Sequence, residues 1–279
     1  MLMPFEYYGP KTVDEVDTLL RERPDSTLFA GGTNLVVDME LDHIRPTHLI
    51  NIKEVAGLNE MDLPADGPAF IGAAVPISRL CKSSRAPWQC IEDAVDTMAT
   101  PQVRNRATLI GNLCNASPAA DMAPPMLVLG TTLSIRKTDG STGSIALENF
   151  FKGVNETALA PGEWVIGANV GSSSGRGKSR FYKKQRVRGH DLAIVNVAGL
   201  CNPELGKLRI AVGSCAETPL LFDFSQHYAD SKSLTEIESL ILTEVAAGIK
   251  PIDDVRATAE YRKDMALYFT KRLLAEIYC

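Results

Sequence analysis

The sequence lacks the patterns that mark several common binding functions. No run of Lys or Arg stands out in its 279 residues, and the formal net charge is −5. Both observations argue against a nucleic-acid partner. The longest apolar stretches fall well short of the roughly 18 residues that a membrane span needs. The first residues have neither a basic start nor an apolar core, so we expect no signal peptide and a cytoplasmic protein.

Cysteine and histidine patterns are equally sparse. The six cysteines include no CxxC pair and no spacing typical of a zinc or iron–sulfur site. The four histidines form no HExxH motif, and no Ser-His-Asp arrangement can be read from the sequence. We therefore expect scattered reduced thiols, no metal site and no catalytic acid, base or nucleophile on this chain. Any iron–sulfur chemistry must come from another chain.

The composition is that of an ordinary globular protein, with 45% apolar and 23% charged residues, and the length suits two modest domains. A stretch rich in Gly and Ser includes the predicted linker, residues 173–177. It separates a first domain, residues 1–172, from a second, residues 178–279.

Apolar periodicity and turn residues place the secondary structure along the chain. The predicted strands cover residues 5–8, 27–30, 48–52, 69–75, 127–135, 142–147, 192–200 and 208–212. The predicted helices cover residues 13–23, 35–40, 88–98, 233–246 and 257–277. Residues 100–121 are too polar and broken for a regular element, so we expect a long irregular loop there.

Two segments are candidates for a binding site. The first is Ala30-Gly31-Gly32-Thr33-Asn34-Leu35, which lies between a strand and a helix. Adjacent glycines let backbone N–H groups approach an anion such as a pyrophosphate, and the following helix favours negative charge. The segment matches neither GxGxxG nor GxxxxGK[ST]. Taken alone, it is also consistent with a simple turn.

The second candidate is the polar segment, residues 99–121. Small residues, hydroxyls and amides are concentrated there, and four of them could bind phosphate, amide and hydroxyl groups: Thr108, Gly111, Asn112 and Asp121. The alternative is a solvated loop in which Asn and Asp satisfy their own turns.

These residues carry a resemblance. AGGTNL (residues 30–35) and TPQVRNRATLIGNLCNASPAAD (residues 100–121) closely resemble the two FAD-binding segments in the flavoprotein subunits of the xanthine dehydrogenase and carbon monoxide dehydrogenase family. The resemblance continues in order through residues 156–165, 181–198, 208–221 and 259–266, and so covers nearly the whole chain. It implies an α+β fold, with a bilobed FAD-binding domain of the vanillyl-alcohol-oxidase (PCMH-like) type. The lobes would span about residues 1–55 and 56–172, and a small α/β C-terminal domain would cover the isoalloxazine side.

The resemblance also implies roles for individual residues. The turn formed by Ala30, Gly31, Gly32, Thr33, Asn34 and Leu35 would hold the FAD pyrophosphate through backbone N–H groups. Further contacts would come from Thr108, Gly111 and Asn112 on the phosphate and adenosine side, Asp121 at the ribityl hydroxyls, Val165, and Lys183 at the flavin end. A cation there is plausible because it stabilises an anionic reduced flavin. A solvated Lys183, with Lys184 beside it, is the alternative.

One position departs from the family pattern. Relatives usually read T-I-G-G-N in the second segment, whereas this chain has Thr108-Leu109-Ile110-Gly111-Asn112. If the missing glycine requires a positive φ, Ile110 would cost more than about 1 kcal/mol and weaken or alter FAD binding. Asn34 in place of a common Asp is a milder change, because both form the same turn.

By resemblance, the chain is the electron-transfer subunit of a molybdopterin-dependent hydroxylase. A large subunit with molybdopterin would oxidise the substrate, and a small [2Fe–2S] subunit would pass electrons to the FAD of this chain. NAD or another acceptor would then receive them. Two alternatives stay open at this point: a stand-alone flavin oxidoreductase on the same fold, and a degenerate scaffolding subunit without flavin.

Overall fold

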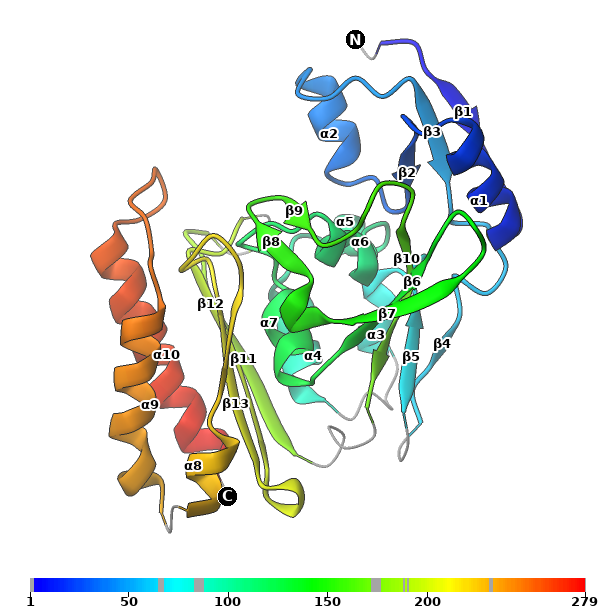
Figure 1. The fold of residues 1–279 in the computed structure, drawn as a ribbon. Coiled ribbons are helices and arrows are strands. Elements are labelled where there is room, and N and C mark those ends of the chain that lie inside the picture. The colour runs from blue at the N-terminus through cyan, green and yellow to red at the C-terminus, as the bar shows by residue number, and fades with distance from the viewer. Residues whose placement is uncertain are drawn as a thin grey trace.

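The computed structural model describes residues 3–64, 68–82, 88–171, 177–187, 189, 191–230 and 233–278. Within these ranges the strands form a small parallel sheet, a five-stranded sheet, a four-stranded sheet and a two-stranded ribbon (Figure 1). The first three succeed one another along the chain, with helices packed between and against them. The predicted mixture of helices and sheets is confirmed. Apart from Gly177, the predicted linker lies outside the described residues.

The first sheet is a compact βαβαβ unit. Its strands lie in the order β1 (Glu6–Tyr8), β3 (His48–Asn51), β2 (Thr27–Phe29), all parallel, and they are connected by α1 (Val13–Glu22) and α2 (Leu35–Glu40). The hydroxyl of Thr12 accepts from the backbone N–H of Glu15 at 3.2 Å and so caps α1. The predicted alternation of strand and helix in this region is confirmed.

The second sheet is antiparallel. Its order is β4 (Met61–Asp62), β5 (Ala69–Gly72), β10 (Trp164–Val170), β6 (Thr132–Arg136), β7 (Thr142–Ala146). The predicted hairpin between β6 and β7 is present, but its first strand does not begin at residue 127. Residues 127 and 128 belong to helix α7 (Ala123–Val128). A short, fully buried apolar run has no periodicity that separates strand from helix, so the sequence prediction was wrong there.

Buried Asp17 joins the first two sheets. One carboxylate oxygen accepts from the indole N–H of Trp164 at 3.0 Å, and the other accepts from Nε of Arg136 at 2.8 Å. Asp17 lies on α1, whereas its two partners lie on β10 and β6 of the five-stranded sheet. A buried carboxylate with charged and neutral donors therefore fixes the two lobes relative to each other.

Four short helices lie between β5 and α7 in the second lobe: α3 (Ile77–Lys82), α4 (Gln89–Thr97), α5 (Pro101–Arg104) and α6 (Leu109–Cys114). The prediction of an irregular loop over residues 100–121 was therefore wrong in part. Thr100 and Thr108 each begin a helix, and their hydroxyls accept from the N–H groups of Val103 and Gly111. Capping hydroxyls compensate for the weak helix propensity of these polar stretches. The 3₁₀ turn Leu147–Asn149 and the ribbon β8 (Phe151–Gly153) and β9 (Glu156–Thr157) complete this part.

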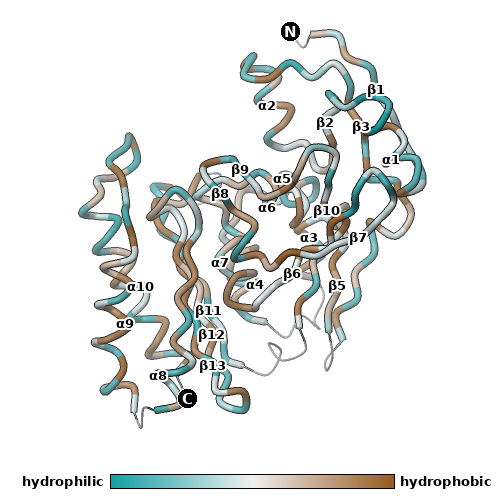
Figure 2. Tube along the Cα trace, viewed as in Figure 1, coloured by the Kyte–Doolittle hydropathy of each residue, from teal (hydrophilic) through white to brown (hydrophobic). Residues whose placement is uncertain are grey.

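The C-terminal sheet is antiparallel, in the order β11 (Lys178–Lys184), β12 (Val195–Asn202), β13 (Lys207–Gly213), β14 (Leu220–Asp223). Helices α8 (Ser225–Asp230), α9 (Leu234–Gly248) and α10 (Ala259–Ile277) follow, with α10 against the outer face of the sheet and α9 against α10 (Figure 1). Helices α4 and α7 of the preceding lobe pack on β11, β12 and β13. The sheet is thus covered on both sides, which explains why all of β12 is buried. Figure 2 shows many hydrophobic residues along the strands of this sheet.

Candidate cofactor-binding site

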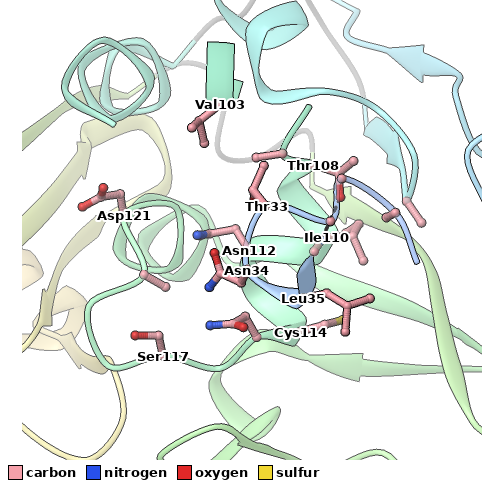
Figure 3. Close-up of a pocket in the computed structure, with 18 of the residues that line it drawn as sticks. Thr33, Asn34, Leu35, Val103, Thr108, Ile110, Asn112, Cys114, Ser117 and Asp121 are labelled. Carbon is pink, nitrogen blue, oxygen red and sulfur yellow. Dashed lines mark hydrogen bonds between the residues drawn. The ribbon is translucent and has the colours of Figure 1, made fainter. Parts of the chain in front are cut away.

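A cavity of about 730 Å³ lies where the two lobes and the C-terminal domain meet. Its volume falls within the range of roughly 300–1,000 Å³ that is usual for ligand pockets. Its walls come from four parts of the chain: residues 30–35, residues 107–121, the start of β10, and the loop between β11 and β12. Figure 3 shows the labelled lining side chains of the first two parts.

The glycine turn forms one wall through its backbone. No described residue accepts a hydrogen bond from the N–H groups of residues 31–34, although each of these residues lines the cavity. Gly32 has φ +72°, in the left-handed region that favours glycine. A Cβ atom on Gly31 would lie 2.4 Å from the carbonyl oxygen of Arg106. Both glycines are therefore required by the backbone, and the result is a row of donors, without an acceptor among the described residues, in the wall of the cavity.

Positive charge gathers behind this turn. Nζ of Lys53 donates to the carbonyl oxygen of Ala30 at 3.1 Å and lies 3.7 Å from the ring centre of Phe29. Burial lowers the pKa of Lys53, and the neighbouring charge of Arg106 lowers it further. Lys53 and Arg106 are thus two cations close to each other near the turn, where they would attract an anionic group. Sequence reasoning gave neither residue a role: Lys53 belongs to no recognisable motif, and Arg106 lies within the second candidate segment without being singled out.

Helix α6 forms the adjoining wall. The hydroxyl of Thr108 accepts from the N–H of Gly111 at 3.0 Å, and a Cβ on Gly111 would lie 2.9 Å from that oxygen. Oδ1 of Asn112 accepts from the N–H of Met122 at 3.2 Å. In Figure 3 the amide nitrogen of Asn112 is directed toward the side of the cavity where Asp121 lies. Thr108 and Gly111 thus shape the helix start, and Asn112 keeps a donor for a ligand.

Ile110 causes no backbone strain. It lies inside α6, is 4% exposed, packs in the large hydrophobic core and also lines the cavity (Figure 3). The non-glycine residues with positive φ near the cavity are instead Ala99 (45°) and Ala116 (47°). The condition for strain at Ile110, a positive φ, is therefore not met, because the backbone at this position is right-handed helix, which any β-branched residue can adopt.

A buried ion pair closes the wall opposite the glycine turn. Asp121 is 7% exposed, and its Oδ2 accepts from Nζ of Lys183 at 2.7 Å. Nζ of Lys183 also donates to the carbonyl oxygen of Asp191 at 3.0 Å. Burial raises the pKa of Asp121, while the charge and hydrogen bond of Lys183 oppose that rise. Lys183 is neither a solvated strand lysine nor part of the cavity wall, because it lies behind Asp121.

The loop between β11 and β12 completes the cavity with a second ion pair. A guanidinium N–H of Arg186 donates to Asp191 at 3.2 Å, and the backbone N–H of Arg186 donates to the same carboxylate at 2.8 Å. The hydrogen bond from the Arg186 side chain lowers the pKa of Asp191 to about 2. Leu192, which is 58% exposed, follows on the rim. Sequence reasoning missed these three lining residues, since an Arg and an Asp five positions apart form no motif.

The structure thus gathers the predicted site residues, with one exception. The predicted residues that line the cavity are Ala30, Gly31, Gly32, Thr33, Asn34, Leu35, Thr108, Gly111, Asn112, Asp121 and Val165. Lys183 does not line the cavity, because it lies behind the side chain of Asp121.

In the described part of the chain, no helix combines the length and apolar character of a membrane span.

Comparison with known proteins agrees with this geometry. A family model described as the FAD binding domain in molybdopterin dehydrogenase matches residues 3–170, and the CO dehydrogenase flavoprotein C-terminal domain matches residues 180–277. The xanthine dehydrogenase FAD-binding subunit of Escherichia coli O157:H7 is 27% identical over 97% of this chain and 94% of its own length. The carbon monoxide dehydrogenase medium chain of Hydrogenophaga pseudoflava is 27% identical, with 97% and 96% covered.

Solved structures extend the comparison to the fold. Carbon monoxide dehydrogenase from Hydrogenophaga pseudoflava, in a form that lacks the Mo-pyranopterin moiety, superimposes with a TM-score of 0.89 at 25% identity and covers 100% of this chain and 98% of that one. Quinoline 2-oxidoreductase from Pseudomonas putida 86 gives a TM-score of 0.86 at 25% identity, with 99% and 98% covered. The chain therefore belongs to the family of FAD-binding medium subunits of the xanthine and carbon monoxide dehydrogenases.

The residues present fit the cofactor that this family implies. A diphosphate needs several donors in a row and room for close approach. Residues 31–34 offer N–H groups for which no described residue is an acceptor, and Gly31 and Gly32 add no side chain to the wall. The cavity then continues past Asn112 and Asp121 to the Arg186–Asp191 pair. Its far end thus carries the polar and charged groups that a hydroxylated chain and a redox-active ring require.

Proposed function

We propose that this chain holds FAD along the cavity, with the diphosphate at the N–H groups of residues 31–34 and the isoalloxazine at the loop between β11 and β12. The row of N–H groups for which no described residue is an acceptor carries the proposal. Unpaired backbone donors are unfavourable unless water or a ligand accepts from them. The cations Lys53 and Arg106 behind the turn would add long-range attraction for the diphosphate.

The other predicted residues take roles that suit their positions. The amide of Asn112 would donate toward the phosphate and adenosine side, while Thr108 and Gly111 fix the start of α6. Asp121 would accept from the ribityl hydroxyls, because a carboxylate oxygen that accepts one donor retains capacity for another. Buried Val165 would pack against the cofactor. Lys183 would act through Asp121 rather than by direct contact.

In the assembled enzyme, we propose that the chain receives electrons from [2Fe–2S] clusters of a small subunit and passes them to NAD or another acceptor. A large subunit with molybdopterin would oxidise the substrate. FAD suits this place because it accepts electrons singly and releases them in pairs. The names of the relatives, which include a dehydrogenase medium chain and an FAD-binding subunit, support this assignment. The predicted domains, residues 1–172 and 178–279, and a cytoplasmic location belong to the same proposal.

The protein's own task is to orient and insulate the cofactor. The cavity is lined largely by apolar atoms and small residues, and few side chains there could donate or accept a proton. The ion pair Arg186–Asp191 at the rim holds both charges in fixed positions. Because Ile110 lies in right-handed helix, backbone strain at this position gives no support to the scaffolding alternative.

The proposal is tested with the purified full chain. We expect an oxidised-flavin absorption band after incubation with FAD and desalting, with one FAD per chain. In the reconstituted three-subunit complex, substrate added without oxygen should bleach this band, and NAD should restore it if NAD is the acceptor. A chain that retains no flavin even within the complex would contradict the proposal.

A further inference from the structure

One rung of the C-terminal sheet faces the cavity residue Asp121. Lys183 on β11 pairs with Asn196 on β12, and Asn196 pairs with Gly213 on β13. Nζ of Lys183 donates to Oδ2 of Asp121 at 2.7 Å, and Nδ2 of Asn196 donates to Oδ1 at 3.2 Å. Directly paired residues on neighbouring strands share one face of a sheet. The two strands therefore supply one donor to each oxygen of the carboxylate.

A buried asparagine at position 196 is unfavourable for the stability of the fold. It is fully buried, as is every residue of β12, and its Oδ1 has no hydrogen-bond partner among the described residues. A Cβ atom on Gly213 would lie 2.1 Å from that Oδ1, so the amide fits only because the next strand carries a glycine. Since a buried acceptor without a donor destabilises the fold, an apolar residue would serve packing better. Local choices that oppose stability are expected at functional positions.

The loop that carries Asp121 docks on the same rung. The N–H of Ser214 donates to the carbonyl oxygen of Pro118 at 2.8 Å, and Nδ2 of Asn196 reaches the carbonyl oxygen of Ala120 at 3.4 Å. Asn196 therefore contacts both the backbone that carries Asp121 and the carboxylate itself. It does not line the cavity, so an effect on a ligand would pass through the residues it contacts there, Ala120 and Asp121.

We propose that Asn196 is a positioning residue, which together with Lys183 holds the Asp121 carboxylate in the orientation that accepts hydrogen bonds from the hydroxyl chain of the cofactor. This inference rests on the proposed binding of FAD. Two fixed donors leave the remaining lone pairs of Asp121 directed to the cavity. Gly213 provides the space for the Asn196 amide, so the whole rung Lys183–Asn196–Gly213 serves one carboxylate.

The test compares two probes on the full chain by titration calorimetry. FAD carries the ribityl hydroxyls, whereas ADP carries the diphosphate and adenosine without them. Asn196→Leu should weaken FAD binding roughly ten-fold, because the loss of a hydrogen bond to a charged group is of that size. ADP binding should stay within about two-fold of the wild type. Asn196→Ser, which no longer reaches Asp121 and adds no bulk, should give the same selective loss.

Asn202→Leu is the matched control. Asn202 is also a buried asparagine on β12, 1% exposed, and its Oδ1 accepts from the N–H of Leu205 at the far end of the strand. This variant should lower the melting temperature without changing the ratio of FAD to ADP affinity. If the wild-type chain binds ADP but not FAD, or neither, the proposed function itself fails. If the wild type binds FAD and both Asn196 variants keep the wild-type FAD-to-ADP ratio, the positioning role is overturned.

Discussion

The two ends of the cavity are built by different means. At the glycine turn, residues 31–34 supply backbone N–H groups, and the essential feature is the lack of side chains at Gly31 and Gly32. At the opposite end, the wall consists of charged side chains held in pairs, Asp121 with Lys183 and Arg186 with Asp191. Backbone donors suit a diphosphate, because its charge does not change during electron transfer. Paired charges suit a redox ring, because they can stabilise one charge state over another.

The comparison also explains how a substitution acts at each end of the cavity. The backbone wall depends on close packing between the first lobe and the segment before α6, and it has no spare volume at Gly31. The side-chain wall depends on the docking of the C-terminal sheet. A substitution in the first wall therefore acts by steric exclusion, whereas one in the second leaves a charge without its partner.

The largest effect should come from restoring the usual glycine at position 110. Ile110 is 4% exposed in α6, so Ile110→Gly creates a cavity and places glycine within a helix. We expect the free energy of unfolding to fall by about 4 kcal/mol. FAD affinity per folded molecule should not improve. Urea denaturation and flavin titration measure the two effects, and Ile110→Val, with a loss near 1 kcal/mol, is the control. Tighter FAD binding by the glycine variant would mean that the backbone wall does require a glycine there.

A somewhat smaller loss should follow from breaking the buried ion pair. Lys183→Met leaves the Asp121 carboxylate without its charged partner, and we expect a loss of about 3 kcal/mol in unfolding free energy. Lys184→Met, at the neighbouring and partly exposed position, should change stability by no more than about 0.5 kcal/mol. Equal effects of the two variants in chemical denaturation would contradict the buried role of Lys183.

The backbone wall is probed by Gly31→Ala. The added Cβ would meet the carbonyl oxygen of Arg106 at 2.4 Å, which forces the turn away from α6. We expect about 2 kcal/mol less stability and at least a ten-fold loss of FAD affinity, measured by calorimetry. The control is Gly143→Ala on β7, where a Cβ meets nothing within 4 Å. If Gly31→Ala kept the wild-type affinity for FAD, the glycine turn would not be the site that binds the cofactor.

The smallest effect depends on pH. Asp191 has a pKa lowered from 3.8 to about 2, chiefly by the hydrogen bond from Arg186. A lowered pKa contributes stability above pH 3.8 that is lost as the pH falls toward 2. The stability difference between the wild type and Asp191→Asn should therefore be at most about 2 kcal/mol at neutral pH and shrink in acid. A difference that stays constant down to the acid limit would show that Asp191 acts by shape alone.

Much of the site could be predicted because it depends on local features. The glycine turn lies between a strand and a helix whose periodicity is evident, and its function follows from residues that are adjacent in sequence. The same holds for the start of α6, although the capping by Thr108 was hidden in a segment of low helix propensity. Where the prediction of a strand from residue 127 was wrong, an apolar run buried on all sides gave no periodic signal.

The charged end of the cavity could not be predicted from local patterns. Lys183 and Asp121 are 62 positions apart, and only the docking of β11 against the preceding lobe brings them together. Asn196 and Gly213 depend on strand register, which a single sequence does not specify. Lys183 does not line the cavity but lies behind Asp121, so the contact predicted for it at the flavin end stays a prediction. Whether Ile110 causes strain depends on its φ angle, which the sequence does not give.

The most direct test of the two-ended cavity is a crystal structure of the full chain with FAD bound. The account predicts diphosphate oxygens within hydrogen-bond distance of the N–H groups of residues 31–34. It also predicts ribityl hydroxyls at Asp121 and the isoalloxazine ring beside the loop that carries Arg186 and Asp191. FAD bound in the reverse direction, or outside this cavity, would contradict the account.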